Sequence, residues 1–268
     1  MTSRELVLRA MAGEQVERPV WVPFVGCHGG KLLGVTAEEF LTSEELLLNG
    51  LKTAYDRYRP DGLPVAFDLQ IEAEMLGCPL HWADEAPPAV TGHPMSGQPM
   101  DAFPAYDTST GRLPMVLSAL RRIRAGWGKD LALYGLITGP FTLAMHLRGP
   151  ELFLEMFDDP DGVNVLMERC TEVACRTAEA YLEAGADVVA VVDPMTSQIS
   201  PDAFADFVGP YLDQVFDRIR ERGGMSSLFV CGDASRNLEA MCETHCDNVS
   251  IDENISLDLL RELARPQE

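Results

Sequence analysis

The sequence predicts an α/β fold with a parallel sheet, either a (β/α)8 barrel or a doubly wound sheet. Candidate strands and helices alternate along most of the chain, the order that produces parallel sheets. The segment Val188–Val192 is continuously apolar, as is typical of a strand buried on both faces of such a sheet. The chain of 268 residues is long enough for one large domain of this kind or two small ones.

The expected strands end at turn residues or at reactive side chains. They are Val20–Gly26, Leu63–Asp68, Leu131–Thr138, Val188–Val192, Ser227–Cys231 and Asn248–Asp252. A full (β/α)8 barrel needs eight strands, so the chain is about two βα units short of one. Two open sheet edges are then expected, unless the chain is a fragment, another chain closes the gap, or the topology differs.

The expected helices combine apolar residues at helical spacing with recognisable end signals. Thr36 and Glu39 form a capping-box pattern at the start of one helix. Gly185 is the expected end of a second, and Ser200 caps a third that we expect to bend near Pro210. The ranges are Thr36–Tyr58, Asp161–Ala184, Ser200–Arg222, Arg236–Glu243 and Ser256–Ala264.

One long stretch lacks this periodicity. Cys78–Pro114 is rich in Pro, Gly, Ser and Thr, a composition typical of loops. We interpret it as an excursion on one domain rather than a linker between two. Residues 1–268 are therefore expected to form a single domain.

The charge balance excludes several classes of partner. The chain carries 42 Asp and Glu residues against 21 Lys and Arg, a formal net charge of −21. A surface this acidic argues against nucleic acid and anionic membranes as partners. No apolar run is long enough for a transmembrane helix, and the first residues lack the apolar core of a secretory signal. We therefore expect a cytoplasmic protein.

Reactive side chains follow several of the expected strands. Asp68, Asp193 and Asp252 each come directly after a run of β-formers, and Cys231 ends another. Any one of these aspartates could simply cap the following helix or hold a loop. In a (β/α)8 barrel, however, the carboxyl ends of all strands meet at one face, where active sites lie. As a set, these residues predict a site. The seven cysteines show no disulfide framework and are expected to be free thiols or metal ligands.

The order and spacing of six segments resemble the uroporphyrinogen decarboxylase superfamily. The segments are FDLQIEAEMLGC (Phe67–Cys78), GLITGPFTLAMHLRG (Gly135–Gly149), EAGADVVAVVDP (Glu183–Pro194), SPDAFADFVGPY (Ser200–Tyr211), FVCGDASRNLEAMC (Phe229–Cys242) and VSIDENISL (Val249–Leu257). The resemblance implies a (β/α)8 barrel of the TIM-barrel type, lacking the last one or two βα units.

The superfamily implies two chemistries. One is decarboxylation of uroporphyrinogen without a cofactor, for which Asp68 matches the aspartate that faces the pyrrole nitrogens. This substrate carries eight carboxylates, which arginine forks bind best. The decarboxylases place such arginines after the first strand, where this chain has only Lys31. The other chemistry is zinc-dependent methyl transfer between a methylated corrinoid protein and a thiol or related acceptor, and the residues favour it.

The methyltransferase hypothesis assigns a role to Cys231. Zinc lowers the pKa of a bound thiol and holds it as a thiolate, and a catalytic zinc takes three protein ligands and leaves one position open. The resemblance supplies a His-x-Cys motif at this strand end and a later cysteine. Cys231 matches the first cysteine, whereas Phe229 occupies the histidine position. Cys27 and His28 follow the first expected strand and reach the same rim.

The sequence-based hypothesis is a methyltransferase that moves a methyl group from a methylated corrinoid protein to a thiol or folate-like acceptor. Zinc is the expected cofactor, and the partner protein carries the corrinoid. The expected metal ligand is Cys231, the expected substrate-binding residues are Cys27 and His28, and the expected catalytic residues are Asp68, Asp193 and Asp252. Two alternatives stay open: a uroporphyrinogen decarboxylase, and a non-catalytic barrel that binds a corrinoid or tetrapyrrole.

Overall fold

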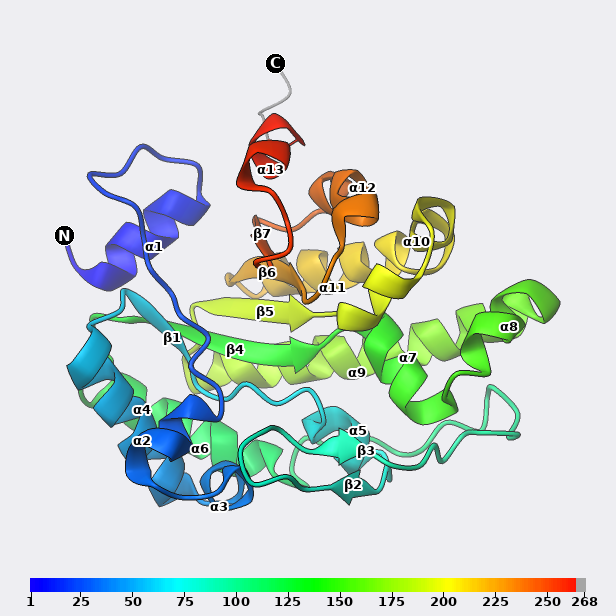
Figure 1. Cartoon of the computed structure of the whole chain (residues 1–268), viewed down its shortest axis with the longest axis horizontal. Helices are drawn as coiled ribbons and strands as arrows, with labels where there is room; N and C mark the ends of the chain where they lie inside the picture. Colours follow the sequence, from blue (N-terminus) through cyan, green and yellow to red (C-terminus); the bar gives the residue numbers. More distant parts are fainter. Residues whose placement is uncertain (264–268) are drawn as a thin grey trace.

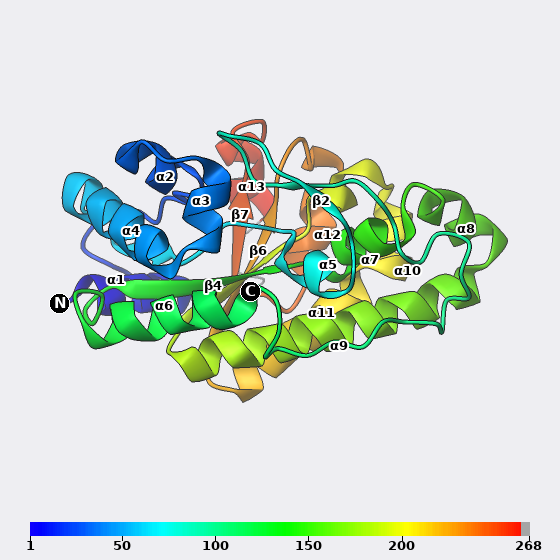
Figure 2. The same ribbon diagram turned by 90° about the horizontal axis from the view of Figure 1, so that it is seen from below.

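The computed structural model describes residues 1–263 and contains a parallel sheet with the strand order β1-β4-β5-β6-β7 (Figure 1). These strands are β1 (Gly62–Pro64), β4 (Ala132–Thr138), β5 (Val188–Val192), β6 (Met225–Val230) and β7 (Asn248–Ile251). In Figure 2, β7 runs across the direction of β4, so the sheet is strongly twisted and curled. The described chain therefore forms about half of a barrel.

Helices cover the sheet and extend from its carboxyl edge. In chain order they are α1 (Ser3–Met11), α2 (His28–Leu33), α3 (Ala37–Thr42), α4 (Glu44–Tyr58), α5 (Ile71–Met75), α6 (Leu113–Ala125), α7 (Pro140–Arg148), α8 (Leu152–Asp158), α9 (Pro160–Ala184), α10 (Pro201–Phe207), α11 (Gly209–Glu221), α12 (Leu238–Glu243) and α13 (Leu257–Leu263). None of the helices within residues 1–263 combines the length and apolarity needed to cross a membrane.

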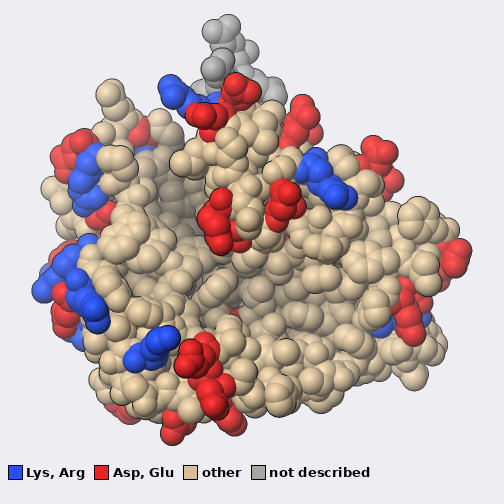
Figure 3. All heavy atoms as spheres, in the orientation of Figure 1, with Lys and Arg blue, Asp and Glu red and all other residues tan. Residues whose placement is uncertain are grey.

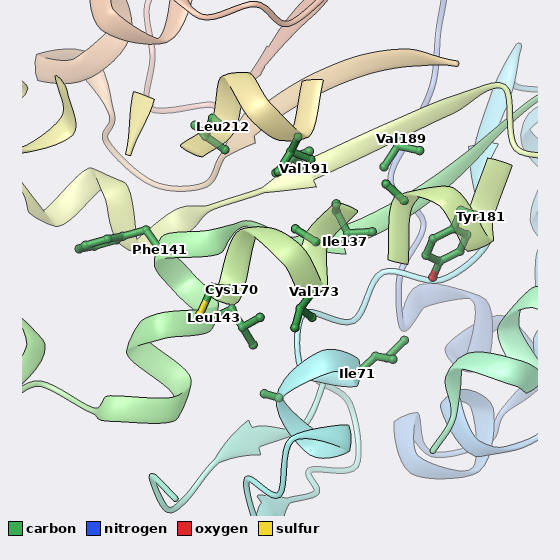
Figure 4. Packing of buried hydrophobic residues seen from close by; sticks show 14 of the residues in the cluster. Ile71, Ile137, Phe141, Leu143, Cys170, Val173, Tyr181, Val189, Val191 and Leu212 are labelled. Atoms are coloured by element: carbon green, nitrogen blue, oxygen red, sulfur yellow. The ribbon is translucent and has the colours of Figure 1, made fainter. Parts of the chain in front are cut away.

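The side chains of β5 separate two apolar layers. Val189 and Val191 point toward α9 and belong to the large core between the sheet and its outer helices (Figure 4). Val188, Ala190 and Val192 belong to a second cluster on the concave face. All five residues are buried, which confirms the prediction of a strand covered on both faces.

The prediction of a first strand at Val20–Gly26 is wrong. These residues lie beside β1, where the carbonyl of Trp21 accepts a hydrogen bond from the backbone N–H of Asp61 at 2.9 Å, but they form no strand. Pro19 and Pro23 lack the N–H groups that a ladder needs. The next expected strand, Leu63–Asp68, is also shorter in the structure, because β1 covers only Gly62–Pro64.

The helix end signals are largely confirmed. Thr36 and Glu39 form the capping box of α3, and Gly185 ends α9 in the left-handed conformation with φ 105°. The expected helix Thr36–Tyr58 is instead two helices, because Ser43 adopts an extended conformation and caps α4. The bend expected near Pro210 is a break between α10 and α11. The expected last helical residue, Ala264, lies outside the described residues.

The excursion contains little regular structure. A short antiparallel hairpin of β2 (Leu80–His81) and β3 (Ala89–Val90) is followed by irregular chain up to α6. Two buried or nearly buried arginines bind this excursion to the rest of the fold. Arg112 at its end pairs with Asp68 and Glu74, and Arg148 donates to the carbonyls of Met95 and Gln98.

Candidate functional site

Asp193 follows β5 and lies fully buried beneath the start of α7. Its Oδ1 accepts hydrogen bonds from the backbone N–H of Thr142 at 2.7 Å and from the Thr142 hydroxyl at 2.6 Å. Its Oδ2 accepts the backbone N–H of Phe141 at 3.2 Å. Burial raises the pKa of Asp193 to about 6, although these donors oppose the shift. Because α7 has Gly139 at its N-cap and no side-chain cap of its own, Asp193 supplies the missing acceptor from another strand.

Asp68 lies at the carboxyl end of the β1 segment and is held by two groups. Its Oδ1 accepts the backbone N–H of Gln70 at 2.9 Å, and its Oδ2 forms an ion pair with Nη1 of Arg112. The Asp68 side chain has no exposed surface. A carboxylate buried to this extent needs a paired cation, and Arg112 provides it. Sequence analysis missed Arg112, since nothing in its local pattern indicates a partner 44 residues away.

Cys231 and Asp252 come together at the ends of β6 and β7. Asp252 accepts the backbone N–H of Gly232 at 2.9 Å, and also the backbone N–H and side-chain amide of Asn254. These hydrogen bonds lower the pKa of Asp252. Burial, followed by the charge of Asp252, raises the pKa of Cys231 to about 11. Without a cation beside it, the Cys231 thiol therefore stays protonated at neutral pH.

Cys27 and His28 lie at the start of α2. They line a cleft of about 440 Å³ together with Lys31, Asp84 and Glu85, among other residues. His28 is exposed, and its Nε2 lies 2.7 Å from the hydroxyl of Tyr58. Burial raises the pKa of Cys27 to about 11, with a further contribution from the charge of Asp68. Cys27 therefore lies near Asp68.

Three phenylalanines connect the separate parts of this rim. The ring of Phe24 lies 5.7 Å from the ring of Phe67 and 5.3 Å from that of Phe229, distances typical of aromatic pairs. Each precedes a candidate residue closely in sequence: Phe24 comes before Cys27, Phe67 before Asp68, and Phe229 before Cys231. The aromatic contacts thus bring together three segments that carry candidate side chains.

A hollow opens next to these rings on the concave side of the sheet. It has a volume of about 380 Å³ and is lined by Val22, Phe24, Phe229, Ser250 and Ile251. The space-filling view shows Asp and Glu side chains on both sides of the central hollow of the face that it draws (Figure 3). The lining therefore combines aromatic and aliphatic side chains with the polar Ser250, and acidic side chains lie on the surface of this face.

The predicted residues form parts of a site rather than one cluster. Asp252 lies beside Cys231, Cys27 lies near Asp68, and Asp193 is buried beneath α7. Within residues 1–263, no three His, Cys, Asp or Glu side chains come together in a way that could hold a metal ion. Phe229, at the position of the expected histidine ligand, contacts other aromatic rings instead. The catalytic and binding roles of the six residues stay predictions.

Glu72 is a buried carboxyl that sequence analysis did not single out. Its Oε1 accepts the backbone N–H of Thr138 at 3.3 Å, and its Oε2 lies 2.9 Å from the Thr138 hydroxyl. That hydroxyl also lies 2.7 Å from the carbonyl oxygen of Leu69, which can only accept a proton. The contact with Oε2 is therefore completed by a proton on Glu72. Burial raises the pKa of Glu72 to about 7 and outweighs the backbone N–H of Thr138, which opposes the shift.

We expect Glu72→Gln to remove part of the pH dependence of folding. A carboxyl whose pKa rises from 4.5 to about 7 contributes stability that is complete below about pH 4.5 and is lost as the pH rises through 7. A glutamine amide keeps the donor to Thr138 at all pH values. The variant should gain on the order of 3 kcal/mol of unfolding free energy relative to the wild type between about pH 5 and pH 8. Urea unfolding at several pH values measures this. An unfolding free energy that changes equally with pH in the two proteins would contradict the prediction.

Comparison with known proteins identifies the family of the chain. A family model described as uroporphyrinogen decarboxylase (URO-D) matches residues 2–267. The chain belongs to this family. The chain also matches a solved structure, a methyltransferase from Methanosarcina mazei. The TM-score is 0.89 at 26% identity, over 99% of this chain and 82% of that one.

Curated relatives of this URO-D family member include both activities. The methylcobamide:CoM methyltransferase MtbA of Methanosarcina mazei is 29% identical over 74% of the chain. Uroporphyrinogen decarboxylase 2 of Arabidopsis thaliana is 23% identical over 96% of it. The matched parts amount to 59% of the methyltransferase and 68% of the decarboxylase, so the chain spans about three-fifths of the length of the first of these relatives.

Proposed function

We propose that the protein transfers a methyl group from a methylated corrinoid, carried by a partner protein, to a small thiol. The observation that supports this most directly is the half-buried Cys231 thiol at the carboxyl end of β6, beside the Asp252 carboxylate. It occurs in a chain similar to a methylcobamide:CoM methyltransferase. The sequence-based hypothesis also includes a folate-like acceptor in place of the thiol.

The transfer itself is a displacement at carbon. The acceptor sulfur attacks the methyl carbon in line, the cobalt–carbon bond breaks, and its electron pair stays on cobalt. The thiol proton must leave before or during attack, because a thiolate is the nucleophile. We propose that Asp252 orients the acceptor at the rim, while Cys27 and His28 bind it from the cleft at α2. Asp68, which is buried beside Arg112, would stabilise charge at the rim through its field rather than by contact with the acceptor. Asp193 would act from beneath, by holding the start of α7.

Zinc at Cys231 is the least supported part of this hypothesis. A catalytic zinc takes three protein ligands, whereas the described residues offer one thiol with one neighbouring carboxylate and place the Phe229 ring where a histidine was expected. This donor set does not fit a catalytic zinc. What favours zinc is the chemistry of the thiol, which stays protonated without a cation.

The charges at the rim favour decarboxylation of uroporphyrinogen less than they favour methyl transfer. The described lining of the cleft beside Cys27 has one lysine and no arginine, and the Nζ of this residue, Lys31, lies 3.5 Å from a carboxylate oxygen of Glu85. Asp84 lines the same cleft. Such a surface would repel a polycarboxylate rather than bind it. A non-catalytic barrel that binds a corrinoid or tetrapyrrole would use the hollow at Phe24 and Phe229 instead.

A direct assay separates these functions. The purified protein is mixed with methylcobalamin and 2-mercaptoethanesulfonate, and methylated thiol is quantified by mass spectrometry. We expect protein-dependent methylated thiol together with loss of methylcobalamin absorbance. Formation of coproporphyrinogen from uroporphyrinogen, without methyl transfer, would support the decarboxylase instead. Binding of methylcobalamin without either product would support the non-catalytic barrel.

A further inference from the structure

Arg112 connects three separate segments next to the candidate site. Its Nη1 pairs with Asp68 at the end of the β1 segment, and its Nε donates to Oε2 of Glu74 on α5 at 2.6 Å. The guanidinium lies 5.0 Å from the ring centre of Trp82, which belongs to the excursion. Only 11% of the Arg112 side chain is exposed. The excursion therefore reaches Asp68 through the Arg112 side chain.

The charges of the neighbouring groups hold Arg112 against Asp68. Burial lowers the pKa of Arg112, but the carboxylates of Asp68 and Glu74 outweigh this and raise it, so the guanidinium stays charged. Asp68 is fully buried, and removal of the cation would leave a buried carboxylate unpaired, which is strongly unfavourable. With Arg112 on Oδ2 and the Gln70 N–H on Oδ1, the plane of the Asp68 carboxylate is fixed.

We propose that Arg112 is the positioning residue for Asp68, so that the excursion sets the orientation of a rim carboxylate used in methyl transfer. This inference rests on the function proposed above. The remaining terminal nitrogen of Arg112, Nη2, is buried and has no hydrogen-bond partner within residues 1–263. The other two nitrogens of the guanidinium, Nε and Nη1, are both held by carboxylates, and one of these is Asp68.

Arg148 offers a matched control. It is as deeply buried as Arg112, with 9% of its side chain exposed. It also fastens the excursion, because its Nη1 donates to the carbonyls of Met95 and Gln98, while its Nε binds Glu155. It contacts none of the six candidate residues. A loss caused only by loosening of the excursion should therefore appear equally when Arg148 is replaced.

The test compares Arg112→Met, Arg112→Lys and Arg148→Met with the wild type in two measurements. The first is steady-state methyl transfer from methylcobalamin to 2-mercaptoethanesulfonate. For Arg112→Met we expect kcat to fall about tenfold or more with a smaller change in KM, since orientation is lost rather than binding. Lysine keeps the charge but not the fork, so Arg112→Lys should recover part of the loss. Arg148→Met should keep kcat within about twofold.

The second measurement does not depend on activity. The Gln70 amide hydrogen is bonded to Asp68, so its exchange with deuterium reports whether the carboxylate stays in place. We expect faster exchange in Arg112→Met, an intermediate rate in Arg112→Lys and no change in Arg148→Met. Unchanged exchange and kcat in Arg112→Met, or equal effects in Arg148→Met, would overturn the inference. Absence of methyl transfer in the wild type would refute the proposed function, while the exchange data would still decide the role of Arg112. If the methionine variant does not fold, the lysine variant carries both measurements.

Discussion

Replacing Cys231 by alanine is expected to lower methyl transfer on the order of 100-fold, the scale of loss when a positioning group at a reacting centre is removed. The Cys231 side chain packs against the same apolar cluster as Phe229 and lies near the carboxylate of Asp252. It is only half-buried, so the unfolding free energy should change by about 1 kcal/mol or less. Activity measured as kcat/KM, together with urea unfolding, tests both statements.

Cys242 provides the control for this experiment. It is also a partly buried free thiol, but it lies on α12 ahead of β7, and so near the amino ends of the strands. Cys242→Ala should leave kcat/KM within about twofold. Metal analysis of the same proteins tests zinc. Near-stoichiometric zinc that is lost only in Cys231→Ala would establish Cys231 as a ligand. Zinc in neither protein would refute the zinc-thiolate mechanism, and full activity of Cys231→Ala would refute the role of the thiol.

Gly139→Ala is expected to destabilise the fold by about 3 kcal/mol or more. A Cβ at Gly139 would lie 2.3 Å from both Cγ and Oδ2 of Asp193, far inside van der Waals contact. The backbone of Gly139, with φ −64° and ψ 152°, suits alanine well. The loss would therefore come from this clash and from displacement of the carboxylate that caps α7.

Gly209→Ala is the comparison for Gly139→Ala. Gly209 also lies at the start of a helix, but a Cβ there would meet nothing closer than the carbonyl oxygen of Phe204 at 3.7 Å. Its substitution should change the unfolding free energy by less than about 1 kcal/mol. Urea unfolding of the two variants measures the difference. A cost for Gly139→Ala no larger than that for Gly209→Ala would mean that Asp193 moves aside easily.

Features that depend on neighbouring residues could be predicted from the sequence. The capping box at Thr36, the helix end at Gly185 and the buried strand Val188–Val192 all follow from patterns within a few residues. The strand expected at Val20–Gly26 failed for an equally local reason: its β-forming composition was given more weight than Pro19 and Pro23, which interrupt the hydrogen-bond ladder.

The candidate site depended on contacts between distant segments, which the sequence does not encode locally. The carboxyl ends of the strands did bring Cys231 beside Asp252, as the parallel topology implies. The pairing of Asp68 with Arg112 could not be read from either segment, because it joins residues far apart in the chain. A buried aspartate nevertheless implies a paired cation, and the excursion supplies one in Arg112.

The contacts among Phe24, Phe67 and Phe229 have a consequence for how this rim can evolve. Each ring is held by the other two, and each lies within three residues of a candidate polar side chain. Placing a histidine at position 229 alone would remove one phenyl ring from the group and open space around the remaining two. The segments that carry Cys27 and Asp68 would then be displaced. A change of chemistry at β6 therefore requires compensating substitutions at positions 24 and 67, so the three sites should covary as a unit among relatives.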